Sequence, residues 1–227
     1  MRSFRKQMKF HWIDFRKAIY IFWLVLILVN STQIVIQHFW PGIIDSPIDQ
    51  VFAANYSVIA IFTLVAGLIT ATQTFPLMMS FGFTRKQFFI NVQIISIIYC
   101  AGMALMQSIV VHAGSAIIHL FDFQPQSSLI PFFTLWYMQF WIYLAISFLF
   151  FVMGIVFYRF GTLAGIFVIA VYIMLLYWIT EKPSFDSYFN SITANTSPTL
   201  ILIPLIITII AASIGWLLCR RAAIRTH

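Results

Sequence analysis

Six long apolar runs recur along the chain, separated by shorter stretches in which polar and turn-forming residues collect. At about 1.5 Å per residue, runs of about 18–27 residues are long enough to cross a hydrocarbon core of about 30 Å as helices. Open strands would leave backbone groups unpaired in lipid, so spans of this kind must be helical. The predicted spans cover residues 18–38, 51–74, 84–111, 131–157, 162–179 and 199–219.

Composition agrees with this pattern and excludes a soluble domain. Of the 227 residues, 62% are hydrophobic and only 8% are charged, whereas soluble domains carry about 25% charged residues. No soluble core of this length could hide so much apolar surface, and the chain is too short for two membrane domains. We therefore expect an all-α, polytopic membrane protein whose six-helix transmembrane domain covers residues 18–219.

The basic residues predict the orientation of the spans. Twelve of the 13 Lys and Arg residues lie in the N-terminal segment, in the second and fourth connections, or in the tail over residues 220–227; only Lys182 lies on the opposite side. Because Lys and Arg are retained on the cytoplasmic side of membranes, both termini are predicted to be cytoplasmic, in a multi-pass protein of the cell membrane. The net charge of +7 thus reflects topology and does not indicate nucleic-acid binding.

Residues 1–17 are predicted to form a separate amphipathic helix. Phe4, Met8, Trp12 and Phe15 recur at helical spacing, with basic residues gathered on the other side. Such a helix would lie in the cytoplasmic interface, with its apolar face in the acyl boundary and its basic face toward anionic headgroups. This helix could serve only as a basic anchor that sets the topology, or it could in addition contact a partner protein.

A break between the second and third runs carries four helix-boundary signals. Gly82 suits the left-handed position just after a helix end. Thr84 and Gln87 have the spacing of a capping box, which makes Thr84 the N-cap of the next helix, and Phe83 with Phe88 fit a hydrophobic staple. Pro76 is tolerated in a first helical turn and is expected to interrupt the second span.

The break is therefore predicted to contain a short, stiff helix over residues 75–81 at the cytoplasmic surface. Its apolar side chains would be exposed there: Phe75, Leu77, Met78, Met79 and Phe81. Exposed apolar residues on a rigid element usually mark a partner, and methionines adapt to a cleft. The alternative is a tight turn whose apolar residues sink into the lipid interface.

The segment Ser80-Phe81-Gly82-Phe83-Thr84-Arg85-Lys86-Gln87-Phe88-Phe89 resembles the S-x-G-x-[ST]-R-K-x-F-F pattern of bacterial ABC-2 type transporter permeases. The six-span plan, the cytoplasmic termini and the amphipathic N-terminus are similar too. The resemblance implies a coupling helix over residues 75–81, with its exit at 82–86, that docks on a separate ATP-binding subunit carrying the ATP and Mg. It also implies a second permease, of the same or a homologous chain. The implied coupling residues are Phe75, Pro76, Leu77, Met78, Met79, Ser80, Phe81, Gly82, Thr84, Arg85 and Lys86.

No catalytic or cofactor motif accompanies this pattern. The sequence contains no G-x-x-x-x-G-K-[ST] and no hydrolase or metalloprotease motif, so we expect no enzyme activity and no cofactor on this chain. No acidic residue lies at depth in a span, which disfavours a proton- or sodium-driven carrier. His112 and His119 fit interface histidines better than a metal site.

Few polar residues interrupt the spans. The amides Asn30, Gln33, Gln37 and Gln107 could form interhelical hydrogen bonds or line a cargo path. The pairs Gly161–Gly165 and Ala211–Gly215 have the spacing of close helix contacts.

The favoured function is a permease subunit of an ATP-driven exporter of a hydrophobic or amphipathic cargo, such as a membrane-active peptide, a lipid or a lipophilic antibiotic. Export as the direction follows from the resemblance. A substrate-capturing membrane subunit of an importer and a non-transport membrane scaffold remain alternatives.

Overall fold

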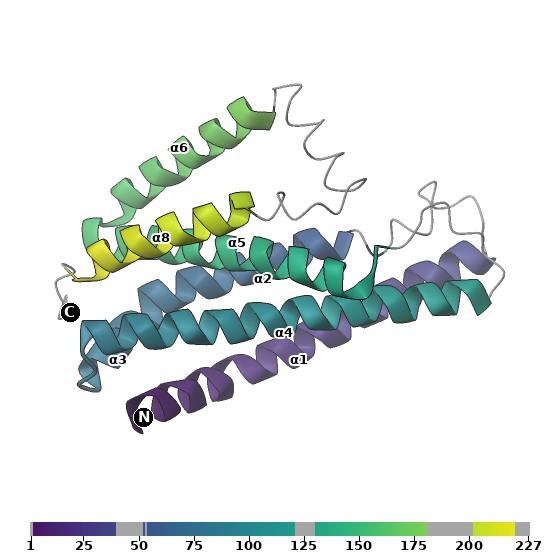
Figure 1. Cartoon of the computed structure of the whole chain (residues 1–227), viewed down its shortest axis with the longest axis horizontal. Helices are drawn as coiled ribbons and strands as arrows, with labels where there is room; N and C mark the ends of the chain where they lie inside the picture. The colour runs from purple at the N-terminus through teal and green to yellow at the C-terminus, as the bar shows by residue number, and fades with distance from the viewer. Residues whose placement is uncertain (1, 40–51, 53, 121–129, 181–201, 221–227) are drawn as a thin grey trace. The chain divides into compact units, whose positions relative to one another are not determined.

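The computed structural model describes residues 2–39, 52, 54–120, 130–180 and 202–220 (Figure 1). Within these ranges every regular element is a helix, as expected for an all-α chain. The elements in chain order are α1 (Arg2–Phe39), α2 (Ala54–Ile69), the π-helix η2 (Thr70–Thr74), α3 (Phe75–Ser80), α4 (Arg85–Leu120), α5 (Phe132–Phe160), α6 (Thr162–Thr180) and α8 (Leu202–Arg220).

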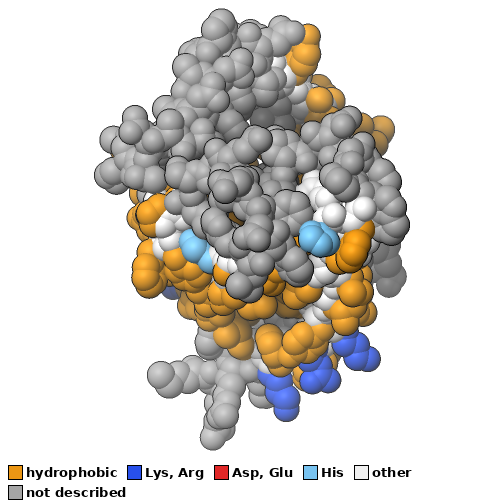
Figure 2. Space-filling model, turned by 90° about the vertical axis from the view of Figure 1, so that its right-hand side faces the viewer, with side chains coloured by type: hydrophobic (Ala, Val, Ile, Leu, Met, Phe, Trp, Pro, Cys, Tyr) orange, Lys and Arg blue, Asp and Glu red, His pale blue; other side chains and the backbone are white. Residues whose placement is uncertain are grey.

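Five helical segments are long and apolar enough to cross a membrane, which is compatible with a multi-pass membrane protein. They are Phe15–Phe39, Ala54–Ser80, Arg85–Ile117, Phe132–Phe160 and Leu202–Arg220. The shorter apolar stretch Thr162–Met174 lies in α6, where the sequence predicts a further span. Figure 2 shows a face on which the described side chains are mainly hydrophobic and the Lys and Arg side chains gather at one edge.

The N-terminal segment differs from its prediction. Residues 1–17 were expected to be a helix distinct from the first span, but α1 runs without interruption from Arg2 to Phe39. No proline or glycine occurs between these residues, so nothing in the sequence ends the helix near residue 17. The position of this segment at a membrane interface stays a prediction.

The helix that contains the third predicted span is longer than the span itself, whose end at residue 111 stays a prediction. Helix α4 continues past residue 111 to Leu120 and contains 36 residues, about 54 Å at about 1.5 Å per residue. The residues after Val111 are mostly good or tolerable helix formers, and Gly114 lowers helix propensity without ending the helix. The apolar residues between 112 and 120 therefore belong to α4.

The chain divides into two compact units, which are described separately. The first unit contains Met1–Phe62 and Ile97–Phe140, and the second contains Thr63–Ser96 and Trp141–His227. Helices α2, α4 and α5 contribute one part to each unit.

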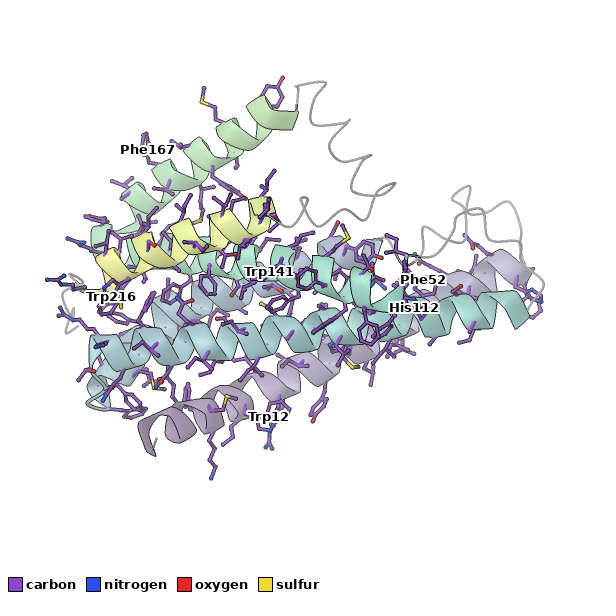
Figure 3. The ribbon with its side chains drawn as sticks, in the orientation of Figure 1. Trp12, Phe52, His112, Trp141, Phe167 and Trp216 are labelled. Atoms are coloured by element: carbon purple, nitrogen blue, oxygen red, sulfur yellow. The ribbon has the colours of Figure 1, made fainter. Side chains whose placement is uncertain are left out.

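The first unit has an apolar core at the ends of four helices. Phe52, Val111 and Leu135 are buried together, with Ile34, Tyr56, Val110 and Ile130 packed against them. Phe52 and His112 are labelled near one another in Figure 3. The Phe52 ring occupies the space next to Gly114, where an added Cβ would lie 2.1 Å from its Cζ. The indole Nε1 of Trp136 donates a hydrogen bond to the Ala101 carbonyl at 3.1 Å and ties α5 to α4.

The second unit is held by close helix contacts at small residues. A Cβ added at Gly67 would lie 2.7 Å from the carbonyl oxygen of Ser147, so α2 and α5 approach each other at the backbone. Gly154 similarly faces Ala71 and Leu68. Only one of the two predicted small-residue pairs is confirmed as a helix contact. Ala211 is buried and Gly215 packs near Val152 and Phe89.

The Gly161–Gly165 pair has a different role. Gly161 has φ +89° and separates α5 from α6, and its N–H bonds to the Phe157 carbonyl at 3.0 Å, as in a left-handed helix C-cap. Gly165 then leaves room for the Phe157 ring, which packs against the start of α6. The spacing therefore marks a helix–helix turn, and not a stripe of close contacts along one helix.

Two glycine-to-alanine substitutions are expected to have opposite effects. Gly67→Ala should lower the free energy of unfolding by about 1–3 kcal/mol, because the backbone of Ser147 cannot move away from the new Cβ. Gly102→Ala should raise it by about 0.5–1 kcal/mol, because nothing lies within 4 Å of its added Cβ and alanine favours the helix. Thermal unfolding of the detergent-purified chain measures both. Equal unfolding temperatures of Gly67→Ala and Gly102→Ala would contradict the close approach of α2 and α5.

Candidate coupling site

The helix that contains the predicted coupling residues is a continuation of the second span. Helices α2 and α3 are joined by the π-helix η2, and the junction residues Ile69, Thr74 and Phe75 all have right-handed helical dihedrals. Pro76 has no N–H and its ring crowds the carbonyl four residues before it. The wider π-turn accommodates this, with the Phe75 N–H bonded to the Thr70 carbonyl. The predicted interruption at Pro76 is therefore wrong: it produces a π-helix within one continuous helical segment.

Helix α3 ends in a Schellman motif, with a boundary one residue before the predicted one. Gly82 has φ +80°, which confirms its predicted left-handed conformation. Its N–H bonds to the Met79 carbonyl at 3.0 Å, and the Phe83 N–H bonds to the Met78 carbonyl at 3.2 Å. These two bonds satisfy the last carbonyls of the helix and define the direction of the chain beyond it.

Helix α4 begins with the predicted capping box. The Gln87 N–H donates to Thr84 Oγ1 at 3.2 Å, and the Thr84 N–H donates to Gln87 Oε1 at 3.3 Å. Together these bonds satisfy two of the free N–H groups at the helix start. Only Gly82, Phe83 and Thr84 separate the C-cap of α3 from α4, so the junction is short and capped on both sides. The staple between Phe83 and Phe88 stays a prediction.

The burial of α3 corrects the expectation that all its apolar side chains are exposed. Phe75 and Met78 are each 1% exposed and Met79 is 9% exposed, so these three residues belong to the core of the second unit. Only Leu77, at 38%, and Phe81, at 62%, are exposed. Sequence reasoning missed the difference because a helix that continues a span keeps one face against its neighbours.

Aromatic rings connect the buried face of α3 to the rest of the second unit. The Phe75 ring makes edge contacts with Phe88 of α4, at 5.2 Å between centroids, and with Tyr158 of α5, at 5.3 Å. Phe88 stacks on Phe151 at 6.5 Å. Because packed aromatic side chains resist small displacements, a push on α3 would reach α4 and α5 directly.

Arg85 has a structural role that the sequence did not reveal. Its Nη1 donates a hydrogen bond to the Arg220 carbonyl at 2.9 Å, at the C-terminus of α8. A cation at a helix C-terminus satisfies a free carbonyl and complements the helix dipole. The start of α4 is thus tied to α8, which also contacts it through Phe89 and Trp216, with ring centroids 5.3 Å apart (Figure 3).

What remains exposed at the junction is a small mixed surface, which we call the coupling surface. Its members are Leu77, Ser80, Phe81, Gly82, Thr84 and Lys86. Ser80 Oγ donates to the Leu77 carbonyl at 2.7 Å, so its polar group is satisfied within α3. The surface presents two apolar side chains and one cation on a rigid support. It suits docking to a protein and contains no group arranged for catalysis.

The four amides considered as cargo-path lining are not equivalent. Asn30, Gln37 and Gln107 are buried and Gln33 is half-buried, and all four belong to the first unit. Gln107 Nε2 donates to the Phe52 carbonyl at 3.3 Å. Three further buried amides in this unit, Gln7, Asn55 and Gln139, were missed. For Asn55 and Gln139 the signal was visible in the sequence, because each lies inside an apolar run.

The described residues hold no group of three or more side chains suited to a metal ion. His112 Nδ1 lies 2.9 Å from the Ser108 carbonyl, and its ring packs on Phe132 at 5.3 Å between centroids. The side chain of His119 lies outside the described residues, as do the acidic connections.

Comparisons of the chain with protein-family models, with curated proteins and with solved structures gave no match. The function proposed for the chain therefore rests on its own residues, on their geometry and on the sequence resemblance given above.

Proposed function

We propose that the chain is the membrane permease subunit of an ATP-driven transporter, with ATP hydrolysed on a separate subunit. The observation that carries the proposal is the coupling surface. Leu77 and Phe81 expose apolar side chains at the end of a membrane-length helix, on a junction that is capped on both sides and packed from beneath by aromatic rings. Such a rigid apolar protrusion is typical of a site that a partner protein grips.

The proposed topology has six spans. They are α1, the combined segment α2–η2–α3, α4, α5, α6 and α8. An even number of spans brings both termini to one side of the membrane, and the distribution of Lys and Arg favours the cytoplasm for that side. The coupling surface, which carries Lys86, then faces the cytoplasm, where ATP is available.

In the proposed mechanism, two ATP-binding subunits lie beneath two permeases, which are identical or homologous. Closure of the ATPase dimer presses on Leu77 and Phe81. The contacts of Phe75 with Phe88 and Tyr158 pass the displacement to α4 and α5, and the Arg85–Arg220 hydrogen bond passes it to α8. Coupling in this form needs a stiff junction, and the short capped turn at Gly82–Thr84 supplies one.

The cargo proposed for this subunit is hydrophobic or amphipathic. The segments proposed to cross the membrane are strongly apolar, and the described residues of their central parts carry no charged side chain. A strongly charged cargo would find no partner of opposite sign at depth. Export as the direction follows from the resemblance to ABC-2 permeases.

The test is affinity purification of the full-length chain from its native membranes, followed by reconstitution with what is retained. We expect a protein with a P-loop to co-purify in a fixed ratio, and we expect ATP hydrolysis to drive movement of a fluorescent amphipathic peptide across the vesicle membrane. Tight capture of a small molecule by the chain alone, with no ATPase retained, would favour an importer subunit. If neither an ATPase nor a tightly bound small molecule is found, the result would favour a non-transport membrane scaffold.

A further inference from the structure

Four buried primary amides stand out in the first unit because each comes from a different helix. Asn30 of α1, Asn55 of α2, Gln107 of α4 and Gln139 of α5 are exposed by 4%, 4%, 0% and 5%. We call this set the amide layer. All four lie within long, mainly apolar helices, where an amide is costly to bury.

The four amides occupy matching positions along their helices, each close in sequence to a residue of the apolar core of the unit. Helices α1 and α4 run toward the apolar core around Phe52, Val111 and Leu135, whereas α2 and α5 start at it. On α1, α4 and α5 the amide lies one helical turn from a core position on the same helix face, and Asn55 is the second residue of α2, just after Phe52. Asn30 precedes Ile34 by four residues, Gln107 precedes Val111 by four, Gln139 follows Leu135 by four and Asn55 follows Phe52 by three. The hydrogen bond from Gln107 to the Phe52 carbonyl fixes α4 beside the start of α2.

The polar atoms of the amide layer are largely unused. Asn30 Nδ2, Asn55 Nδ2, Gln107 Oε1 and both Nε2 and Oε1 of Gln139 are buried and have no hydrogen-bond partner. Buried polar groups are normally paired, and each that is not lowers stability. Because rotation of an amide about its terminal bond exchanges donor and acceptor, the layer offers both kinds of group in either orientation.

We propose that the amide layer is a binding site for an uncharged peptide segment, whose backbone amides supply the missing partners. Each peptide unit carries one N–H donor and one C=O acceptor, and a primary amide side chain can bond to both. The unused donors and acceptors come from four different helices of the unit, so they suit a ligand that enters between these helices.

The surroundings explain why the ligand must be uncharged. The nearest charged residue before Asn30 on α1 is Lys17, 13 residues or about 20 Å along the helix. Helix α4 carries no charged residue between Lys86 and Gln107. His112, the only titratable side chain near Gln107 on α4, already holds its Nδ1 against the Ser108 carbonyl. A charged ligand would be left without a counterion, whereas a neutral peptide needs only hydrogen bonds.

The inference rests on the proposed function in calling the peptide a cargo, but its test needs neither ATP nor an ATPase. Binding is measured on the full-length chain alone in mild detergent, as the shift in thermal unfolding midpoint. The probe is the capped peptide N-acetyl-Leu-Ala-Leu-Ala-amide. Its backbone N-methylated form lacks the donors, and a monoacylglycerol tests a hydroxyl lipid instead of a peptide.

The informative variant is Gln139→Met, which removes two unused polar atoms with little change in volume. The matched control is Gln73→Met, at an exposed position in the second unit. We expect the peptide to raise the midpoint of the wild type and of Gln73→Met by at least about 2 °C, and the midpoint of Gln139→Met not at all. Without peptide, Gln139→Met should unfold at the wild-type temperature or above it, because an unpaired buried group has been removed.

The site would be overturned if the peptide did not raise the unfolding midpoint of the wild type, or raised that of Gln139→Met equally. A larger rise with the N-methylated peptide, or a rise with the monoacylglycerol alone, would also overturn it. A marked loss of stability of Gln139→Met without ligand would overturn it as well, because it would show that this amide has a structural role. If the wild type shows no peptide-induced shift but an ATPase still co-purifies with the chain, the site fails while the proposed function stands.

Discussion

Phe81→Asp is expected to abolish ATP-driven transport while the chain remains folded. Phe81 is 62% exposed at the end of α3, so a charge there is solvated and costs little stability. If Phe81 is an anchor for the ATP-binding subunit, its loss should weaken their association at least about 30-fold, since central anchors contribute about 2 kcal/mol or more and about 1.4 kcal/mol is a factor of ten. Association of the two purified proteins and transport by the reconstituted complex measure the effect.

The matched variant for this experiment is Phe81→Leu, which keeps an apolar side chain at the same position. It should retain association within about threefold, because the partner's pocket loses only part of its contact. Size-exclusion chromatography and thermal unfolding of both variants show whether insertion and folding are unchanged. Full transport by Phe81→Asp in a normally assembled complex would remove this residue from the coupling surface.

Met78→Asp is expected to prevent folding, and not merely to uncouple transport. Met78 lies on the buried face of α3 and is 1% exposed. An aspartate there would bury a carboxylate with no cation to pair it, which costs several kcal/mol, about 4–5 or more. Since proteins are stable by only about 5–15 kcal/mol, most of the folded population should be lost. The measurements are the monodisperse yield in mild detergent and the thermal unfolding midpoint.

The control for this prediction is the neighbouring substitution Leu77→Asp. Leu77 is 38% exposed, so the variant should lose no more than about 1 kcal/mol of stability. Sequence reasoning alone predicts that Met78 behaves like Leu77, as an exposed coupling residue. A stable, monodisperse Met78→Asp protein that fails to bind an ATPase would restore that interpretation and contradict the packing of α3.

Much of the local structure at the junction was predictable because it depends on neighbouring residues. The left-handed Gly82 and the reciprocal hydrogen bonds of Thr84 and Gln87 were both expected, and both are present. Capping is a short-range interaction between side chains and backbone a few residues apart, so a sequence pattern carries it directly. The apolar helices likewise follow from the length and composition of the runs.

Burial at the same junction was not predictable because it depends on distant residues. Phe75 is buried by Tyr158 and by Phe88, which packs on Phe151, and nothing in the local sequence states that those rings come together. The role of Arg85 is of the same kind, since its acceptor is the carbonyl of Arg220. The amide layer also combines four helices, and single amides in separate runs do not reveal that all four become buried in the same unit.

The sequence by itself determined that this protein is helical and apolar, and where the α3–α4 junction begins and ends, because hydrophobic length and helix caps are properties of contiguous residues. Only the tertiary structure decided that Pro76 produces a π-helix in a continuous helix, that α1 is unbroken, and which of five apolar side chains on α3 reach the surface. Those outcomes depend on which helices pack together, and packing joins residues that are far apart along the chain.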